Sequence, residues 1–143
     1  MELLWLTVDS GASYAPEITA MMKALRTEEN VMTNTKKVER AKPYHQEFRD
    51  RDMCILLAME KGDVAGMISF TPGLMGIIYR LYVKPVYRRR GVGDLLMQST
   101  KEYMKRRGSI EFTVNTIPAN EPAIALYKKY GLTPEYLSLR GKV

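Results

Sequence analysis

The sequence predicts an α/β domain in which a mixed, mostly antiparallel sheet carries helices on both faces. Two observations predict it. Two β-type apolar runs, residues 53–60 and 64–70, are joined by Lys61-Gly62-Asp63, which indicates an antiparallel hairpin. A strand, a helix and a second strand then follow over residues 77–115, and such a β-α-β unit places its two strands parallel.

The elements are assigned from apolar spacing and from clusters of Pro, Gly and polar residues. In chain order we expect a strand at 3–8, a helix at 16–27, a loop at 28–35, a polar helix at 36–51 interrupted near Pro43, the hairpin, a strand at 76–83, a helix at 92–107, a strand at 109–115, a helix at about 120–130 and a last strand at about 136–140. No repeat or linker divides the 143 residues, so a single domain over 1–143 is expected.

Charge is distributed unevenly along the chain. Residues 1–75 hold 9 Lys or Arg and 11 Asp or Glu, a net charge of −2, whereas residues 76–143 hold 13 and 5, a net of +8. A basic half suits an anionic ligand, and nucleic acid is one candidate. The basic residues lack the interleaved aromatic residues of single-strand binders, which disfavours nucleic acid. There is no membrane-length apolar run or signal-peptide pattern, and one cysteine fits a reducing compartment, so a cytoplasmic enzyme is expected.

The turn between the strand at 76–83 and the helix at 92–107 carries the strongest functional pattern. It contains Arg88, Arg89, Arg90, Gly91 and Gly93. Glycines let the backbone approach a ligand closely, and the first N–H groups of a helix have no intrahelical partner. Together with the helix dipole and the arginines, they predict a phosphate or pyrophosphate site. The spacing matches neither a dinucleotide fingerprint nor a nucleoside triphosphate loop.

Arg88-x-x-Gly91-x-Gly93, preceded by Leu81-Tyr82-Val83-Lys84-Pro85, resembles the acyl-CoA signature of the GCN5-related N-acetyltransferases, the GNAT superfamily. A second block strengthens the resemblance. Its members are Asn115, Asn120, Ala123, Leu126, Tyr127 and the step Tyr130-Gly131-Leu132, in the family's order. The resemblance is sharp over residues 77–134 and only general before that. It implies the GNAT fold and transfer of an acetyl group from acetyl-CoA to a primary amine. Because no cluster of His, Cys and Asp has metal-ligand spacing, no metal is expected.

The resemblance also implies roles for individual residues. Backbone groups of Leu81, Tyr82 and Val83 would hold the pantetheine arm, and an N–H there, placed at Leu81, would polarise the thioester carbonyl. Tyr127 would donate to the coenzyme A sulfur. The pyrophosphate would be bound by the N–H groups of the turn and helix start, and the full set of cofactor-binding residues is Leu81, Tyr82, Val83, Arg88, Arg89, Arg90, Gly91, Val92, Gly93, Asp94, Asn115, Asn120, Ala123 and Tyr127.

The general base has no clear candidate. Many relatives carry a carboxylate at the strand position that Ile77 occupies here, and residues 77–80 contain no acid. Tyr79 or Tyr82 acting through water, Glu111 and His45 are the alternatives, and direct binding of the minor neutral amine is another. Cys54 lies in an apolar strand and is expected to be a buried, inert thiol.

Two rivals to the transferase stay open: a non-catalytic acyl-CoA-binding module on the same fold, and a nucleic-acid-binding protein. The resemblance places the acceptor site near residues 25–50 and the C-terminal strands. The acidic residues of the first region could attract a cationic amine or, with the basic residues between them, could equally form a solvated face. They are Glu28, Glu29, Glu39, Glu47 and Asp50. Small amines, peptide N-termini and protein lysines remain candidate acceptors, and a homodimer is possible.

Overall fold

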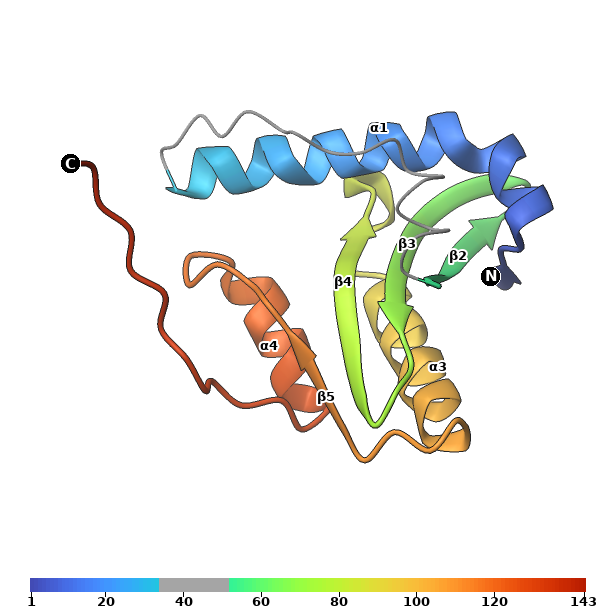
Figure 1. Cartoon of the computed structure of the whole chain (residues 1–143). Coiled ribbons are helices and arrows are strands. Elements are labelled where there is room, and N and C mark those ends of the chain that lie inside the picture. Colours follow the sequence, from blue (N-terminus) through green and yellow to red (C-terminus); the bar gives the residue numbers. More distant parts are fainter. Residues whose placement is uncertain (34–51) are drawn as a thin grey trace.

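A computed structural model describes residues 1–33 and 52–143 of the chain. Over these residues, five strands form one sheet in the order β1-β2-β3-β4-β5, and Figure 1 labels β2 to β5. The strands are β1 (Glu2–Trp5), β2 (Cys54–Glu60), β3 (Asp63–Thr71), β4 (Met75–Val83) and β5 (Glu111–Val114). β4 pairs with β5 in parallel and the other neighbouring strands pair antiparallel, which confirms the predicted mixed sheet.

Helices cover both faces of the sheet, as predicted (Figure 1). They are α1 (Val8–Thr33), α3 (Val92–Arg106) and α4 (Glu121–Lys129), with a short 3-10 turn, η1 (Pro85–Tyr87). The buried cluster under α1 consists of Leu6, Ile18, Met21, Met22, Met53, Ile55, Leu57, Val64, Met67 and Tyr82. The cluster under α3 and α4 consists of Leu56, Ala58, Ala65, Ile68, Phe70, Ile78, Val92, Leu96, Met97, Met104 and Tyr127. Neighbouring strand residues such as Leu56 and Leu57 enter opposite clusters because side chains alternate across a strand.

The first helix is longer at both ends than the predicted helix at 16–27. Its start is fixed by a reciprocal cap: the Ser10 N–H donates to Thr7 Oγ1 at 3.1 Å, and the Thr7 N–H donates to Ser10 Oγ at 2.8 Å. This pair satisfies backbone donors at the helix start, so Pro16 lies inside the helix instead of near its beginning. The first strand correspondingly ends at Trp5.

The loop predicted at 28–35 is wrong for residues 28–33, which continue α1. The polar helix predicted at 36–51 lies outside the described residues. Because α1 extends to Thr33, Glu28 and Glu29 lie on a helix and not in the predicted loop.

The last strand predicted at about 136–140 is also wrong. Residues 132–143 have no regular secondary structure, and the side chains of Tyr136, Leu137 and Leu139 are exposed. A strand is stable only when its backbone pairs with a neighbour, and alternation of apolar residues alone does not provide one. The helix at 92–107 and the hairpin, by contrast, are confirmed to within a residue or two.

Within residues 1–33 and 52–143, no helix combines the length and the apolar character needed to cross a membrane.

Candidate active site

The two parallel strands of the β-α-β unit separate before β4 reaches the turn that leads to α3. β4 and β5 pair from Met75↔Glu111 to Ile78↔Val114, where β5 ends, whereas β4 continues to Val83. The separation coincides with a bulge at Tyr79, where the register shifts between the pairs Ser69↔Arg80 and Phe70↔Ile78. Because a bulge bends its strand, it directs the last residues of β4 away from β5 (Figure 1).

The backbone of β4 beyond the bulge faces two directions. The Lys84 N–H donates to the Ala65 carbonyl at 2.9 Å, so Lys84 opposes Ala65 in the hydrogen-bonding phase of the ladder. Since this phase repeats every second residue, Tyr82 directs its N–H and C=O toward β3, and Leu81 and Val83 direct theirs away from β3. Leu81 and Val83 therefore present backbone groups on the side where β5 has ended.

The turn after β4 has the backbone conformation of an anion-binding loop. Arg89 and Gly91 both adopt left-handed φ angles, +63° and +78°. Gly91 is the N-cap of α3 and brings no side chain that could occupy the first N–H groups of the helix. Left-handed residues turn successive N–H groups toward a common point, and the helix dipole adds partial positive charge there. The conformation suits a phosphate group.

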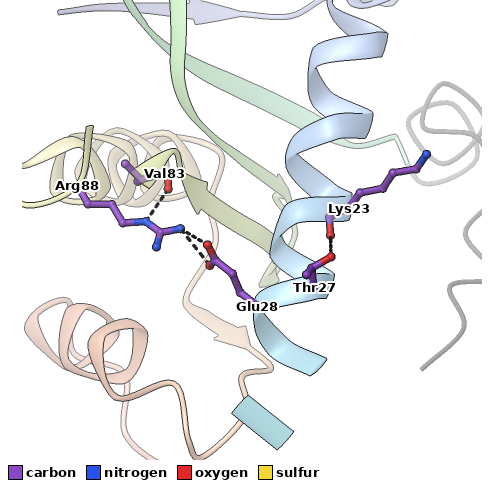
Figure 2. A network of polar contacts seen from close by, with 5 residues as sticks. All are labelled: Lys23, Thr27, Glu28, Val83 and Arg88. Carbon is purple, nitrogen blue, oxygen red and sulfur yellow. Dashed lines mark hydrogen bonds and ion pairs between the residues drawn. The ribbon is translucent and has the colours of Figure 1, made fainter. Parts of the chain in front are cut away.

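Two of the three arginines of this turn are already paired. Arg88 donates from Nη2 to both carboxylate oxygens of Glu28, at 2.7 and 3.0 Å, and from Nε to the Val83 carbonyl at 2.9 Å (Figure 2). Its guanidinium also lies over the Tyr82 ring, 5.4 Å from the centroid. Arg90 donates to Glu60 at 3.2 Å. Arg88 thus connects the end of β4 to α1, on the face of the sheet opposite α3.

The start of α3 is attached to the end of α4. The Asp94 carboxylate accepts from Lys129 Nζ at 2.7 Å and from the Tyr130 hydroxyl at 3.0 Å. The hydrogen bond from Lys129 is the main cause that lowers the pKa of Asp94. A Cβ on Gly93 would lie 3.0 Å from Leu126 Cδ2, so the absence of a side chain also allows α4 to pack closely. Gly93 therefore favours close packing of the two helices, in addition to the access predicted from the motif.

Tyr127 lies on α4 and is 7% exposed. Burial, with a smaller contribution from the negative charge of Glu29 on α1, raises its pKa to about 12. The hydroxyl therefore remains protonated throughout the neutral range. A free thiol has a pKa of about 8.5, so this hydroxyl is suited to donate a hydrogen bond to a thiolate while keeping its proton.

The other residues of the second motif have different environments. Asn120 caps α4, because its Oδ1 accepts from the Ala123 N–H at 3.3 Å. Ala123 is half-buried and packs against the cluster under α3 and α4. Asn115 directly follows β5 and is exposed.

The base candidates are not brought together. Glu111 is exposed and opposes Met75 at the start of the parallel pair, which is four residues, or about 13 Å, from Tyr79. The Tyr79 hydroxyl lies 3.2 Å from Thr71 Oγ1. Tyr82 is buried, which is the main cause that raises its pKa, and Glu28 raises it further. His45 lies outside the described residues.

Cys54 lies on β2 and is half-buried, so the expected full burial of this residue is wrong; partial burial still raises the pKa of its thiol, which fits an inert side chain.

The contribution of α1 is what sequence reasoning missed. Glu28 was among the acidic residues of the expected acceptor region, but in a predicted loop. Nothing in the sequence couples it to Arg88, which lies 60 residues further along the chain. A helix predicted to begin after Thr7 and to continue to Thr33 would have placed Glu28 on a helix instead of in a loop.

Comparisons with known proteins agree with this geometry. Residues 18–132 match the family model described as the acetyltransferase (GNAT) family. A 57-residue segment is 33% identical to a putative ribosomal protein bS18-alanine N-acetyltransferase of Bacillus subtilis (strain 168); it spans 40% of this chain and 38% of that protein.

Two solved structures share the fold over nearly the whole chain. One is an aminoglycoside acetyltransferase from an uncultured soil metagenomic sample, 26% identical, with a TM-score of 0.72 and coverage of 99% of this chain and 97% of that one. The other is an aminoglycoside N-acetyltransferase in complex with CoA, 15% identical, with a TM-score of 0.71 and 99% coverage of both chains. The family-model match favours the predicted transferase over a non-catalytic module. Since the family model matches most of the chain, including both motifs, the chain belongs to the GNAT acetyltransferase family and is an acetyl-CoA-dependent N-acetyltransferase.

Proposed function

We propose that the reaction takes place along β4 beyond the bulge, where acetyl-CoA lies between the end of β4 and α4. The observation that carries this proposal is the orientation of Leu81 and Val83, whose backbone groups face away from β3 after β5 has ended. An extended pantetheine arm has amide groups that can pair with such an edge in the way a strand would. The Leu81 N–H is then the donor to the thioester carbonyl.

The pyrophosphate binds at the start of α3. The left-handed conformation at Arg89 and Gly91 and the first N–H groups of α3 support this assignment. The main chain from Arg89 through Val92, Gly93 and Asp94 provides the donors, because the Arg88 N–H, also expected among them, donates to the Pro85 carbonyl at 3.2 Å. The Asp94 side chain has a different role, because its carboxylate accepts hydrogen bonds from Lys129 and Tyr130 at the end of α4.

Tyr127 donates to the sulfur as the thioester breaks. The amine nitrogen attacks the carbonyl carbon, the C–S bond breaks, and the thiolate leaves with a hydrogen bond from the Tyr127 hydroxyl. The proton that the nitrogen loses as the amide forms passes through water to the thiolate and gives free coenzyme A. The high pKa of Tyr127 supports a hydrogen-bonding role in which the hydroxyl keeps its proton until the thiolate is protonated. An alkyl amine with a pKa near 10 must lose a proton before it attacks, and water near β4 carries this proton away.

The acceptor approaches from the side of α1. Glu28 and Glu29 lie on the last turns of α1, and their charges act on Tyr82 and Tyr127 respectively, so this helix end lies close to both β4 and α4. Negative charge there favours a cationic amine over a neutral one. The related proteins act on aminoglycosides or, by their names, on a ribosomal protein alanine, and both acceptors are amines.

The test is acetyl-CoA-dependent release of free thiol with sisomicin, spermidine and an alanine-initiated hexapeptide as acceptors. Release that requires one of these amines, with the mass of the monoacetylated product, supports the proposal and identifies the acceptor class. Absence of release from all three, while coenzyme A binding is intact, contradicts acetylation of small cationic amines and of this peptide N-terminus.

A further inference from the structure

The Arg88 side chain is paired with Glu28 on α1, and a bound pyrophosphate would compete with Glu28 for this guanidinium. Its Nη2 bonds to both oxygens of Glu28, and its Nε is bonded to the Val83 carbonyl (Figure 2). The same residue begins the turn whose left-handed backbone and helix start suit a phosphate group. Arg88 therefore has its side chain paired with a carboxylate of α1 while its backbone begins the turn proposed to bind phosphate.

Glu28 lies where an acceptor amine would need a counter-charge. It is on α1, and its side chain is 32% exposed, so it is neither fully solvated nor sealed in the core. It borders Tyr82, the residue between the two whose backbone groups face the reacting edge. β4 itself contains no acidic residue. The carboxylate that this strand lacks is thus supplied next to it by a helix.

From this geometry, and resting on the proposed function, we infer that Glu28 is the acceptor-binding carboxylate and that the coenzyme pyrophosphate releases it from Arg88. Phosphate oxygens are strong partners for a guanidinium, and the pyrophosphate carries more charge than one carboxylate. When Arg88 turns to the pyrophosphate, Glu28 loses its cation. A half-buried carboxylate without a partner is unfavourable, and a protonated amine restores the pair.

The exchange makes binding of the two substrates cooperative. The acceptor binds weakly to the free enzyme, because Arg88 occupies Glu28, and binds more tightly once the coenzyme has drawn Arg88 away. By reciprocity, a bound amine also increases the affinity for the coenzyme. Typical coupling between two sites is about 5- to 150-fold, and one exchanged ion pair falls in the lower part of that range.

The test is Glu28→Gln, which keeps the shape of the side chain and removes its charge. Because Arg88 is then free for phosphate, titration calorimetry should show coenzyme A binding about 3-fold or more tighter than in the wild type. With the best amine of the panel above, the KM for the amine should rise roughly 10-fold while kcat changes by less than about 3-fold. If Glu28 only held Arg88 in place for the phosphate, its loss would instead weaken coenzyme A binding.

Two variants serve as controls. Glu17→Gln removes a different ion pair between α1 and the end of β4, the one with Lys84, and should change neither the coenzyme affinity nor the KM. Glu29→Gln removes the carboxylate that acts on Tyr127. Thermal unfolding of each variant establishes that it is folded.

Weaker coenzyme A binding in Glu28→Gln would overturn the exchange, because Glu28 would then position Arg88 for the phosphate. An unchanged amine KM in Glu28→Gln, or a rise confined to Glu29→Gln, would overturn the assignment of the acceptor. Both results can be obtained with an enzyme that carries out the proposed reaction. That failure has its own signature, a wild-type enzyme that binds coenzyme A and acetylates none of the three amines.

Discussion

The two halves of the molecule differ in how they are built for binding. In the proposed site, the coenzyme half, from β4 through α4, contributes mainly backbone groups: those of Leu81 and Val83, the left-handed turn and the start of α3. The proposed acceptor half, represented here by α1, contributes side-chain charge, such as Glu28. Backbone binding requires particular glycines at fixed spacing, whereas side-chain binding requires only that a few residues meet in space. The first kind of site leaves a sequence motif and the second does not.

The largest expected effect is on the coenzyme half. Gly93→Glu should weaken coenzyme A binding at least about 100-fold, equivalent to about 2.7 kcal/mol, because it adds bulk and negative charge at the start of α3. Titration calorimetry with coenzyme A measures the change.

Gly93→Ala is the matched control for that variant. Its Cβ meets the same atom, Leu126 Cδ2 at 3.0 Å, but adds no charge. That atom is the end of a flexible side chain, so we expect a loss of only a few-fold at most. Equal affinities of the Glu and Ala variants would mean that the pyrophosphate does not lie at the start of α3.

Tyr127→Phe should lower kcat by about 100-fold and leave the dissociation constant for coenzyme A within about 2-fold, because only the hydrogen bond to the leaving sulfur is removed. Single-turnover rates and calorimetry separate the two quantities. Tyr130→Phe is the control on the same helix, since its hydroxyl bonds to Asp94 and not to the proposed site. A similar loss of kcat in both variants would show that α4 was disturbed in general and would remove Tyr127 from the chemistry.

The same tyrosine predicts a dependence of stability on alkaline pH. Its pKa is raised from 10.0 to about 12 by burial, so the folded state keeps the proton more tightly than the unfolded state. The corresponding stability is fully present below pH 10 and is lost as the pH rises toward 12. The free energy of urea unfolding should therefore fall less between pH 9 and 11.5 in Tyr127→Phe than in the wild type. Tyr130, whose pKa is also raised to about 12, leaves a residual slope in the variant.

The sequence predicts the fold well where periodicity and turn chemistry agree. The hairpin around Gly62, the β-α-β unit and the Gly108 that ends α3 with a φ of +86° all follow from local patterns. The errors arise where a local signal competes with a stronger one. Pro16 indicated a helix start, but the pair Thr7 and Ser10 caps the helix earlier.

The predicted last strand failed for a different reason. Alternating apolar residues such as Leu137 and Leu139 are compatible with a strand, yet they do not specify which neighbour would pair with it. The candidate site divides in the same way. The turn from Arg88 to Gly93 was predictable from spacing, while the bulge at Tyr79 and the pairing of Arg88 with Glu28 depend on strand register and on a helix 60 residues earlier.

The smallest expected effect distinguishes two roles of the start of α3: its attachment to α4 through the Asp94 carboxylate, and its proposed binding of phosphate through backbone N–H groups. Asp94→Asn breaks the charged bond to Lys129, whose side chain is 61% exposed, so the loss of stability should be about 0.5 kcal/mol at pH 7. Because the pKa of Asp94 is lowered, this contribution is present above the unfolded value of 3.8 and disappears as the pH falls through the folded value. Urea unfolding at pH 7 and pH 2 should therefore show a difference between wild type and variant only at pH 7. Coenzyme A affinity should stay within about 2-fold, since the proposed contact of this residue with phosphate is its N–H and not its carboxylate. A loss approaching that of Gly93→Glu would mean that the attachment of α3 to α4 through Asp94 sets the geometry of the phosphate site, and the coenzyme half would then depend on side chains as much as the acceptor half does.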